Sequence, residues 1–210
     1  MEQTINRGLD GVNIDVSSIC FIDGAKGELI YRGYDIRELA NKASYEEVVH
    51  LLWEGELPTR SQLEAFRAEL RRAFEVPAAV TDLLRTLPRD VSPMHALRSA
   101  VSLLGALDET ADGVDLDNVK RIGRLLLAQF PTIVAGIQRA RQGLEPVAPH
   151  PDLGVAGNFL YMLTGEEPTE AATNVMDVAL VLHAEHGSNA STFVARATAS
   201  TLTDVYSAIT

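Results

Sequence analysis

The sequence predicts an all-α protein that opens with a small β-hairpin. Residues that favour strands cluster before residue 32, whereas helix start and stop signals recur from about residue 35 to the end of the chain. Apolar residues in that second region recur at spacings of three and four, which is the period of a helix with one buried face. With 46% hydrophobic and 22% charged residues among 210, the chain can bury a sizeable core.

The predicted hairpin covers about residues 18–31. Two short runs rich in β-forming residues, 18–22 and 28–31, flank a turn at 23–27 that contains Gly24 and Gly27. No second strand-rich region follows, so the hairpin is expected to be the β-structure of this chain.

Capping signals mark the first helices. Ser44 with Glu47, and Thr59 with Gln62, have the spacing of a capping box. Gly55 follows the first of these helices as a stop signal. Two further helices are predicted after residues 77 and 92, each placed by a proline.

A proline interrupts the next helical segment. Asp117 is expected to begin this segment, and Pro131 is expected to kink or break it into the pieces 119–130 and 132–142. Three prolines then predict a loop at 143–151. Asp152 is expected to cap the helix that follows, which extends to residue 163.

The last third of the chain contains the most apolar predicted helix, at residues 170–185. Because little of its circumference is polar, it is expected to be central and buried. A helix at 191–199 follows a break at Gly187. Thr203 is expected to cap a final segment, 204–209, and a two-turn helix without a docking partner is marginal. The chain is therefore interpreted as a truncated one.

Charge and composition exclude several classes of protein. The formal net charge is −11 and the isoelectric point is near 4.9, so a nucleic-acid partner is not expected. No apolar run approaches the roughly 20 residues that span a bilayer, and no targeting segment is evident. A cytoplasmic protein without a membrane association is predicted. Cys20, the single cysteine, excludes a disulfide within the chain.

Polar residues gather where the predicted buried helix ends, in the segment that contains His183, Glu185, His186, Asn189 and Ser191. Buried polar groups are costly unless they are paired. Three interpretations stay open from the residues alone. They are a hydrogen-bond network that caps the helix, a metal site, and recognition of an oxygen-rich substrate by imidazole with Asn189 and Ser191 in support.

A metal site is the weakest of these interpretations, and no metal is expected. His183 and His186 lack the spacing of the zinc-protease motif, and no cysteine pair supplies further ligands. The other histidines, His50, His95 and His150, are interpreted as structural or solvated. No glycine-rich phosphate loop occurs, so no nucleotide cofactor is indicated.

Five colinear motifs closely resemble those of the citrate synthase family. They are Ile22-Asp23-Gly24, the run from Tyr31-Arg32-Gly33-Tyr34-Asp35-Ile36 to Leu39-Ala40, the run from Leu51-Leu52 to Gly55-Glu56-Leu57-Pro58, residues 158–165, and residues 182–192. The resemblance implies a citrate synthase-like α-helical fold, in which residues 1–210 are the N-terminal part of the large domain and the small domain is absent. It also implies a homodimer.

The resemblance further implies condensation of oxaloacetate with acetyl-CoA to give citrate and CoA, with both as substrates and no separate cofactor. His186 matches the family's oxaloacetate-contacting histidine, and Asn189 and Ser191 match polar residues behind it. The catalytic histidine and aspartate of the family, and its substrate arginines, are expected beyond Thr210, so this chain alone is expected to be inactive. Two alternatives stay open: a 2-methylcitrate synthase, or a non-catalytic helical dimerisation module with its interface around Pro131 and Ala135-Gly136.

Overall fold

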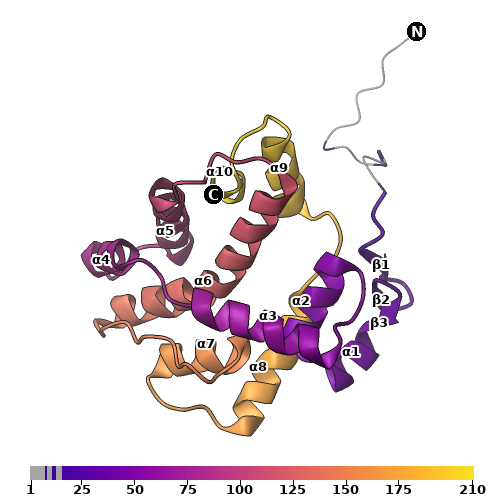
Figure 1. Ribbon diagram of the computed structural model, residues 1–210, viewed down its shortest axis with the longest axis horizontal. Coiled ribbons are helices and arrows are strands. Elements are labelled where there is room, and N and C mark those ends of the chain that lie inside the picture. Colours follow the sequence, from indigo (N-terminus) through magenta and orange to yellow (C-terminus); the bar gives the residue numbers. More distant parts are fainter. Residues whose placement is uncertain (1–7, 9–10, 13–15) are drawn as a thin grey trace.

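The computed structural model describes residues 8, 11, 12 and 16–210. These residues form ten helices and one three-stranded antiparallel sheet, in agreement with the predicted fold class (Figure 1). The strands are β1 (Cys20–Asp23), β2 (Glu28–Tyr31) and β3 (Tyr34–Asp35). The helices are α1 (Ile36–Lys42), α2 (Tyr45–Glu54), α3 (Arg60–Ala73), α4 (Ala78–Thr86), α5 (Pro93–Leu107), α6 (Leu116–Gln142), α7 (Val155–Thr164), α8 (Glu170–His183), α9 (Ala190–Ala199) and α10 (Val205–Ile209).

The sheet extends the predicted hairpin by one strand. β1 and β2 pair as expected, and β3 pairs with β2 across a two-residue turn at Arg32 and Gly33. Both turn residues have positive φ, 48° and 91°, as a tight hairpin of the I′ kind requires. Asp35 ends β3 and also caps α1, because its carboxylate accepts from the Arg37 N–H at 2.7 Å. The two-residue β3 was not predicted because its length is below that of a recognisable strand pattern.

Both predicted capping boxes are confirmed. At α2 the Ser44 side chain accepts from the N–H of Glu47, whose carboxylate in turn accepts from the Ser44 N–H. Thr59 and Gln62 make the same exchange at the start of α3. Gly55 ends α2 with a φ of 92°, a left-handed conformation that few other residues adopt without strain.

The sequence predicts a kink or a break at Pro131, and the structure contains no break. α6 is one helix of 27 residues with Pro131 inside it, although its axis turns near the middle (Figure 1). Ile122 and Leu126 before the proline and Ile133 and Ile137 after it are buried in the same apolar cluster. Packing on both sides therefore holds the two halves together and offsets the lost backbone hydrogen bond.

The start of α7 also differs from the prediction, because the helix begins at Val155 and Asp152 does not cap it. The cap comes from another helix: the buried Glu46 carboxylate of α2 accepts from the Val155 N–H at 2.9 Å. Gly154 leaves room for this carboxylate, since a Cβ there would lie 2.7 Å from Glu46 Oε1. A cap supplied from more than a hundred residues away leaves no local sequence signal.

The helix predicted at 170–185 is not buried. α8 ends at His183 and Val181 is its one buried residue, while Val175 is 72% exposed and Leu182 is 44% exposed. α8 makes its main helix contacts with α1, α2 and α7, and the side chains of Val175 and Leu182 lie outside them. High apolar content did not distinguish a helix buried all round from one buried on a single side.

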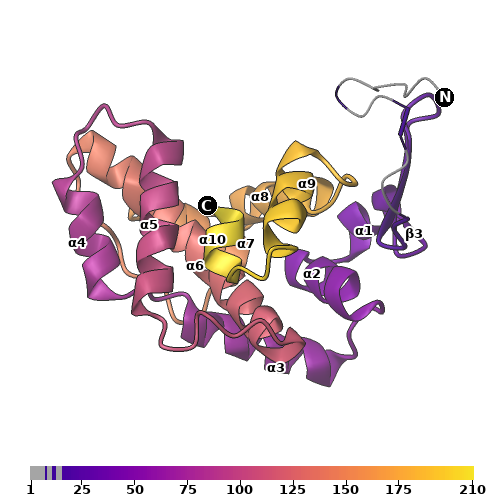
Figure 2. The same cartoon turned by 90° about the horizontal axis from the view of Figure 1, so that it is seen from above.

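The final segment is docked, contrary to the prediction that it lacks a partner. Asp204, rather than Thr203, caps α10, and Tyr206 is only 2% exposed. Its ring lies against Gly105 of α5, where a Cβ would come within 2.9 Å of Tyr206 Cβ. Figures 1 and 2 show α10 beside α9, in contact with α5. Gly105 therefore provides the space that lets the short helix α10 pack against α5.

A carboxylate of α8 holds the start of α2. The two oxygens of Asp177 lie 3.1 and 3.2 Å from the Tyr45 nitrogen, so the Tyr45 N–H donates to the side chain. Burial raises the pKa of Asp177, and the negative charge of Glu46 raises it further against the lowering effect of the Tyr45 hydrogen bond. A carboxyl whose pKa is raised on folding stabilises the fold below its unfolded pKa, and this contribution is lost as the pH rises through the folded pKa.

Asp177→Asn is therefore expected to raise the melting temperature at pH 7, because the amide oxygen still accepts from Tyr45 and the charge is gone. The gain is expected to disappear near pH 3, where the parent carboxyl is protonated. Asp177→Ala is the matched control and is expected to lose about 1 kcal/mol of unfolding free energy, since the Tyr45 N–H loses its acceptor. Thermal melts of the three proteins at both pH values measure this, and a lower melting temperature for Asp177→Asn at pH 7 would contradict it.

Candidate functional site

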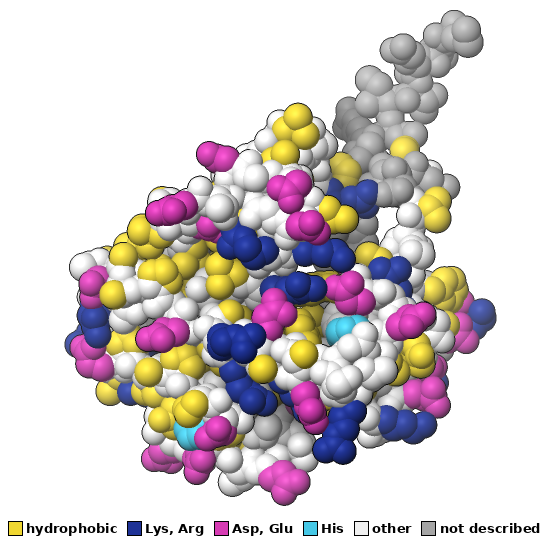
Figure 3. All heavy atoms as spheres, viewed as in Figure 1, with side chains coloured by type: hydrophobic (Ala, Val, Ile, Leu, Met, Phe, Trp, Pro, Cys, Tyr) yellow, Lys and Arg dark blue, Asp and Glu magenta, His cyan; other side chains and the backbone are white. Residues whose placement is uncertain are grey.

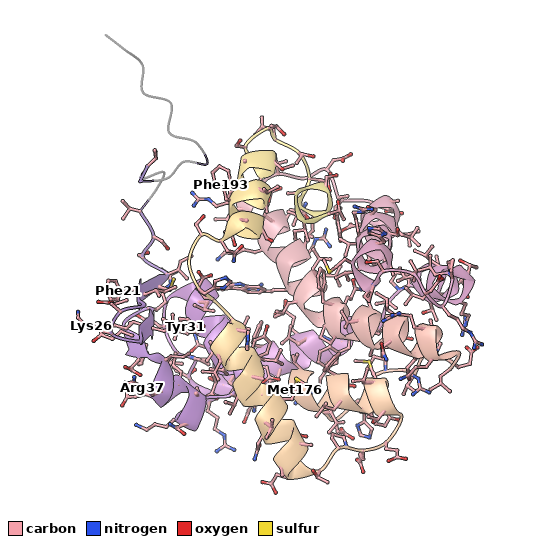
Figure 4. All side chains as sticks on the ribbon, turned by 180° about the vertical axis from the view of Figure 1, so that it is seen from behind. Phe21, Lys26, Tyr31, Arg37, Met176 and Phe193 are labelled. Carbon is pink, nitrogen blue, oxygen red and sulfur yellow. The ribbon has the colours of Figure 1, made fainter. Side chains whose placement is uncertain are left out.

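The polar segment of interest forms the turn between α8 and α9. Ala184 follows the last residue of α8, Gly187 turns the chain with a φ of 88°, and Asn189 caps α9. The turn lies beside the N-terminal sheet, and Figure 4 shows Tyr31 of β2 next to this end of α8. The left-handed conformation of Gly187 lets His186 and Asn189 lie on the same side of the turn.

His186 and Asn189 contact each other directly. Asn189 Oδ1 accepts from the Thr192 N–H at 2.9 Å, which leaves the Asn189 amide nitrogen facing His186 Nε2 at 3.3 Å. Because that nitrogen can only donate, Nε2 accepts and the neutral imidazole carries its proton on Nδ1. The His186 side chain is exposed, so its Nδ1–H is available as a donor to a ligand oxygen.

Ser191 lies apart from this pair. It is exposed in the first turn of α9 and lines a shallow hollow of about 550 Å³ between α9 and α10, together with Ala195, Ile209 and Thr210. Neither His186 nor Asn189 lines that hollow. Of the three predicted site residues, the structure therefore brings two together and places the third in the separate hollow between α9 and α10.

Three residues outside the predicted substrate-binding set, Tyr31, Glu185 and Cys20, fix the backbone around His186. The Tyr31 hydroxyl donates to the Glu185 carbonyl oxygen at 2.7 Å and accepts from the Glu185 N–H at 3.1 Å. The Glu185 carboxylate accepts from the Gly187 N–H at 2.6 Å and from the Cys20 thiol at 3.4 Å. Burial raises the pKa of both Cys20 and Tyr31, so both keep their protons at neutral pH and remain donors.

Three of the other histidines have contacts within the fold, and His95 is exposed, in line with the structural or solvated roles predicted for His50, His95 and His150. His183 Nδ1 lies 2.7 Å from the carbonyl oxygen of Ala179, one helical turn back, and His50 Nδ1 lies 3.0 Å from the carbonyl of Glu56. His150 accepts from the Asp152 N–H at 3.2 Å within the loop before α7. In the part of the chain that the structure describes, no group of three or more His, Cys, Asp or Glu side chains is arranged to hold a metal ion. None of the described helices is long and apolar enough to cross a membrane.

Two larger hollows lie elsewhere on the surface. One, of about 770 Å³ between α2, α3 and α6, is lined by side chains of both charges (Figure 3). Two of its cations are paired: Lys120 and Arg124 lie 3.3 and 3.1 Å from Glu54, and Arg124 also lies 3.7 Å from Glu69. The second, of about 610 Å³, is almost entirely apolar and runs along α6 past Pro131. Neither hollow contains a predicted site residue.

The helical fold matches proteins of known structure. The chain superimposes on citrate synthase from Pyrobaculum aerophilum with a TM-score of 0.92 and 42% identity, covering 98% of this chain and 53% of that one. It also superimposes on citrate synthase from Thermoplasma acidophilum, in a ternary complex with carboxymethyl coenzyme A and oxaloacetate. That match has a TM-score of 0.92 and 29% identity, over 99% of this chain and 54% of the other.

Sequence comparison gives the same class of protein. The family described as "Citrate synthase, C-terminal domain" matches residues 8–210. Citrate synthase from Haloferax volcanii is 49% identical over the whole of this chain and 56% of its own length. A 2-methylcitrate synthase from Mycobacterium tuberculosis is 43% identical over 98% of this chain and 52% of its own length.

The fold and the sequence thus define a homologue of citrate synthases, a class of acyltransferases. The chain belongs to the citrate synthase family. It spans about half the length of the curated relatives it matches.

Proposed function

We propose that the full-length protein, meaning the product of the complete reading frame that contains this chain, is a citrate synthase. It condenses oxaloacetate with acetyl-CoA and releases citrate and CoA. The observation that carries the proposal is the His186 turn. An exposed imidazole, oriented by Asn189 and held by the N-terminal sheet, stands at the motif position that matches the family's oxaloacetate-contacting histidine.

The tautomer of His186 supports this role. With Nε2 accepting from Asn189, the Nδ1–H is the group left to donate to an oxygen of oxaloacetate. In this proposal the exposed Ser191 hydroxyl, two residues beyond Asn189, supports the catalytic histidine of the family. In this proposal residues 1–210 form the N-terminal part of the large domain. The catalytic histidine, the catalytic aspartate and the arginines that bind the substrate carboxylates belong to the remainder, so the 210-residue chain alone is inactive.

A second candidate is 2-methylcitrate synthase. It is supported by the 43% identity to the relative of that name from Mycobacterium tuberculosis. The two activities differ in the acyl group, acetyl or propionyl, and share oxaloacetate. The His186 turn therefore supports both equally, and the choice depends on the pocket for the acyl group.

Steady-state CoA release by the full-length protein tests the proposal. We expect kcat/KM to be higher with acetyl-CoA than with propionyl-CoA at saturating oxaloacetate. A higher value with propionyl-CoA would favour the second candidate, and no oxaloacetate-dependent release with either would contradict both. The 210-residue chain assayed alone is expected to release no CoA.

We also propose that the full-length protein is a homodimer, with the apolar hollow along α6 in the interface. The interface expected around Pro131 and Ala135-Gly136 needs one change, because Ala135 and Gly136 are buried within the chain and a Cβ at Gly136 would lie 2.9 Å from Leu84. Pro131 does line the hollow, together with the exposed Val134, and this supports the same face of α6 as the interface. Sedimentation of the full-length protein at the monomer mass would contradict the dimer.

A further inference from the structure

A tyrosine of the N-terminal sheet lies at the centre of the contacts that hold the His186 turn. The Tyr31 hydroxyl both donates to and accepts from the backbone of Glu185, at 2.7 and 3.1 Å. The carbonyl oxygens of Val181 and Leu182 lie 3.3 and 3.4 Å from the same hydroxyl. These are carbonyls of the last turn of α8, and that of Val181 also accepts from the Ala184 N–H at 3.3 Å. The Tyr31 hydroxyl therefore lies against the end of α8 and fixes Glu185, the second residue beyond it.

The Glu185 side chain extends this anchoring past His186. Its Oε1 atom accepts from the Gly187 N–H at 2.6 Å, and the Cys20 thiol of β1 donates to the same atom at 3.4 Å. The residues on both sides of His186 are thus tied: Glu185 through its backbone to β2, and Gly187 through its N–H to the Glu185 carboxylate. His186 itself makes its side-chain contact forward, to Asn189.

The sheet is a rigid support for these contacts. Tyr31 has no exposed surface and packs in a core cluster with Ile36, Leu51 and Val181. The hairpin turn at Arg32 and Gly33 pairs β2 with β3 immediately after it, which fixes the direction of the strand. The hydroxyl cannot move without moving the sheet or opening this cluster.

We propose that Tyr31 is a positioning residue for oxaloacetate binding, acting through Glu185 on the placement of the His186 imidazole. This inference rests on the proposed function, because it assigns Tyr31 a role at the same site. Tyr31 does not contact the substrate. It holds the backbone from which the contacting imidazole projects.

The substitution Tyr31→Phe removes the hydroxyl and tests its role. The phenyl ring keeps the packing, but the Glu185 N–H and carbonyl lose their common partner, so the turn samples positions in which His186 is displaced. In the full-length protein we expect KM for oxaloacetate to rise about fivefold, the effect of one net hydrogen bond, with KM for acetyl-CoA unchanged. Hydrogen–deuterium exchange of the segment 182–188 is expected to become faster.

Tyr45→Phe is the matched control. Tyr45 is a partly buried tyrosine packed against the same core cluster, and desolvation together with the charges of Glu46 and Asp177 raises its pKa to about 12. Its hydroxyl has no hydrogen bond among the described residues, so its removal breaks no contact with the His186 turn. Both kinetic constants and the exchange of 182–188 are expected to stay at parent values. Glu185→Ala, which releases Gly187 on the other side of His186, is expected to change KM for oxaloacetate in the same direction as Tyr31→Phe.

The outcomes separate this inference from the proposed function. An active full-length protein in which Tyr31→Phe and Glu185→Ala both leave KM for oxaloacetate unchanged overturns the role of Tyr31. So does an equal rise in Tyr45→Phe, which would reflect a general loss of core packing. If the parent shows no oxaloacetate-dependent activity, the proposed function fails and the positioning role falls with it, even where exchange at 182–188 accelerates.

Discussion

His186→Ala in the full-length protein is expected to lower kcat/KM for oxaloacetate by about 100- to 1,000-fold, the usual effect of removing one preorganised hydrogen-bond donor from a polarised oxygen. Alanine removes the Nδ1–H that Asn189 leaves free. Folding is expected to be unaffected, because the imidazole is exposed. Steady-state kinetics with varied oxaloacetate, together with a thermal melt, measure both expectations.

His183→Ala provides the control for this substitution. His183 is three residues away, is exposed as well, and bonds only to the Ala179 carbonyl of its own helix. Its replacement is expected to leave kcat/KM within about twofold of the parent, as removal of a surface side chain usually does. Equal losses in the two variants would mean that the end of α8 matters as a structure and that His186 has no special role.

Tyr206→Ala is expected to have the largest effect on stability, about 3 to 5 kcal/mol of unfolding free energy, as for other buried aromatic residues cut to alanine. The ring fills the space over Gly105 and joins α10 to the core cluster of α5 and α6. Chemical denaturation measures the loss. A change below 1 kcal/mol would mean that α10 is not docked in solution.

Tyr206→Phe isolates the hydroxyl, which donates to Asp108 at 2.8 Å. Burial acts to raise the pKa of Asp108, but hydrogen bonds from Arg121, Thr110 and Tyr206 outweigh it and hold the pKa well below its usual range. A carboxyl with a lowered pKa stabilises the fold above its unfolded pKa, near 4, and this contribution is lost as the pH falls through the folded pKa. The stability difference between the parent and Tyr206→Phe is therefore expected to shrink as the pH falls from neutral into that acid range. A difference that stays constant with pH would contradict the coupling to Asp108.

Features encoded by neighbouring residues could be predicted from the sequence. The capping boxes at Ser44 and Thr59 and the glycine stop at Gly55 depend on residues within one turn of each other, and the structure places all of them as expected. The hairpin at 18–31 is of the same kind, since its turn glycines lie between two β-forming runs.

Features that depend on tertiary contacts could not be predicted in this way. Pro131 does not break α6, because distant side chains pack against both halves of the helix. Glu46 caps α7 from another helix. Gly105 of α5 leaves the space in which Tyr206 of α10 packs. Neither contact produces a pattern among neighbouring residues. The apolar content of α8 predicted full burial, whereas a single face of the helix is packed within this chain.

The same division applies to the candidate site. The polar cluster and its motif selected His186 and Asn189, and their contact follows from the turn at Gly187. In the sequence Tyr31 stands out only as part of the Tyr31-Arg32-Gly33-Tyr34 motif. Its contact with Glu185 leaves no local pattern, because Glu185 is 154 residues further along the chain. A hydroxyl that acts on a distant backbone becomes visible only when the sheet and the end of α8 are seen together (Figure 4).

Nuclear magnetic resonance of histidine-labelled full-length protein, titrated with oxaloacetate, tests the central claim most directly. The claim is that His186 forms part of the oxaloacetate site. Before addition, the His186 ring is expected to show the neutral tautomer with its proton on Nδ1. Oxaloacetate is expected to shift the His186 ring signals saturably while those of His183 stay in place. Saturable binding of oxaloacetate that leaves the His186 signals unmoved would contradict the account.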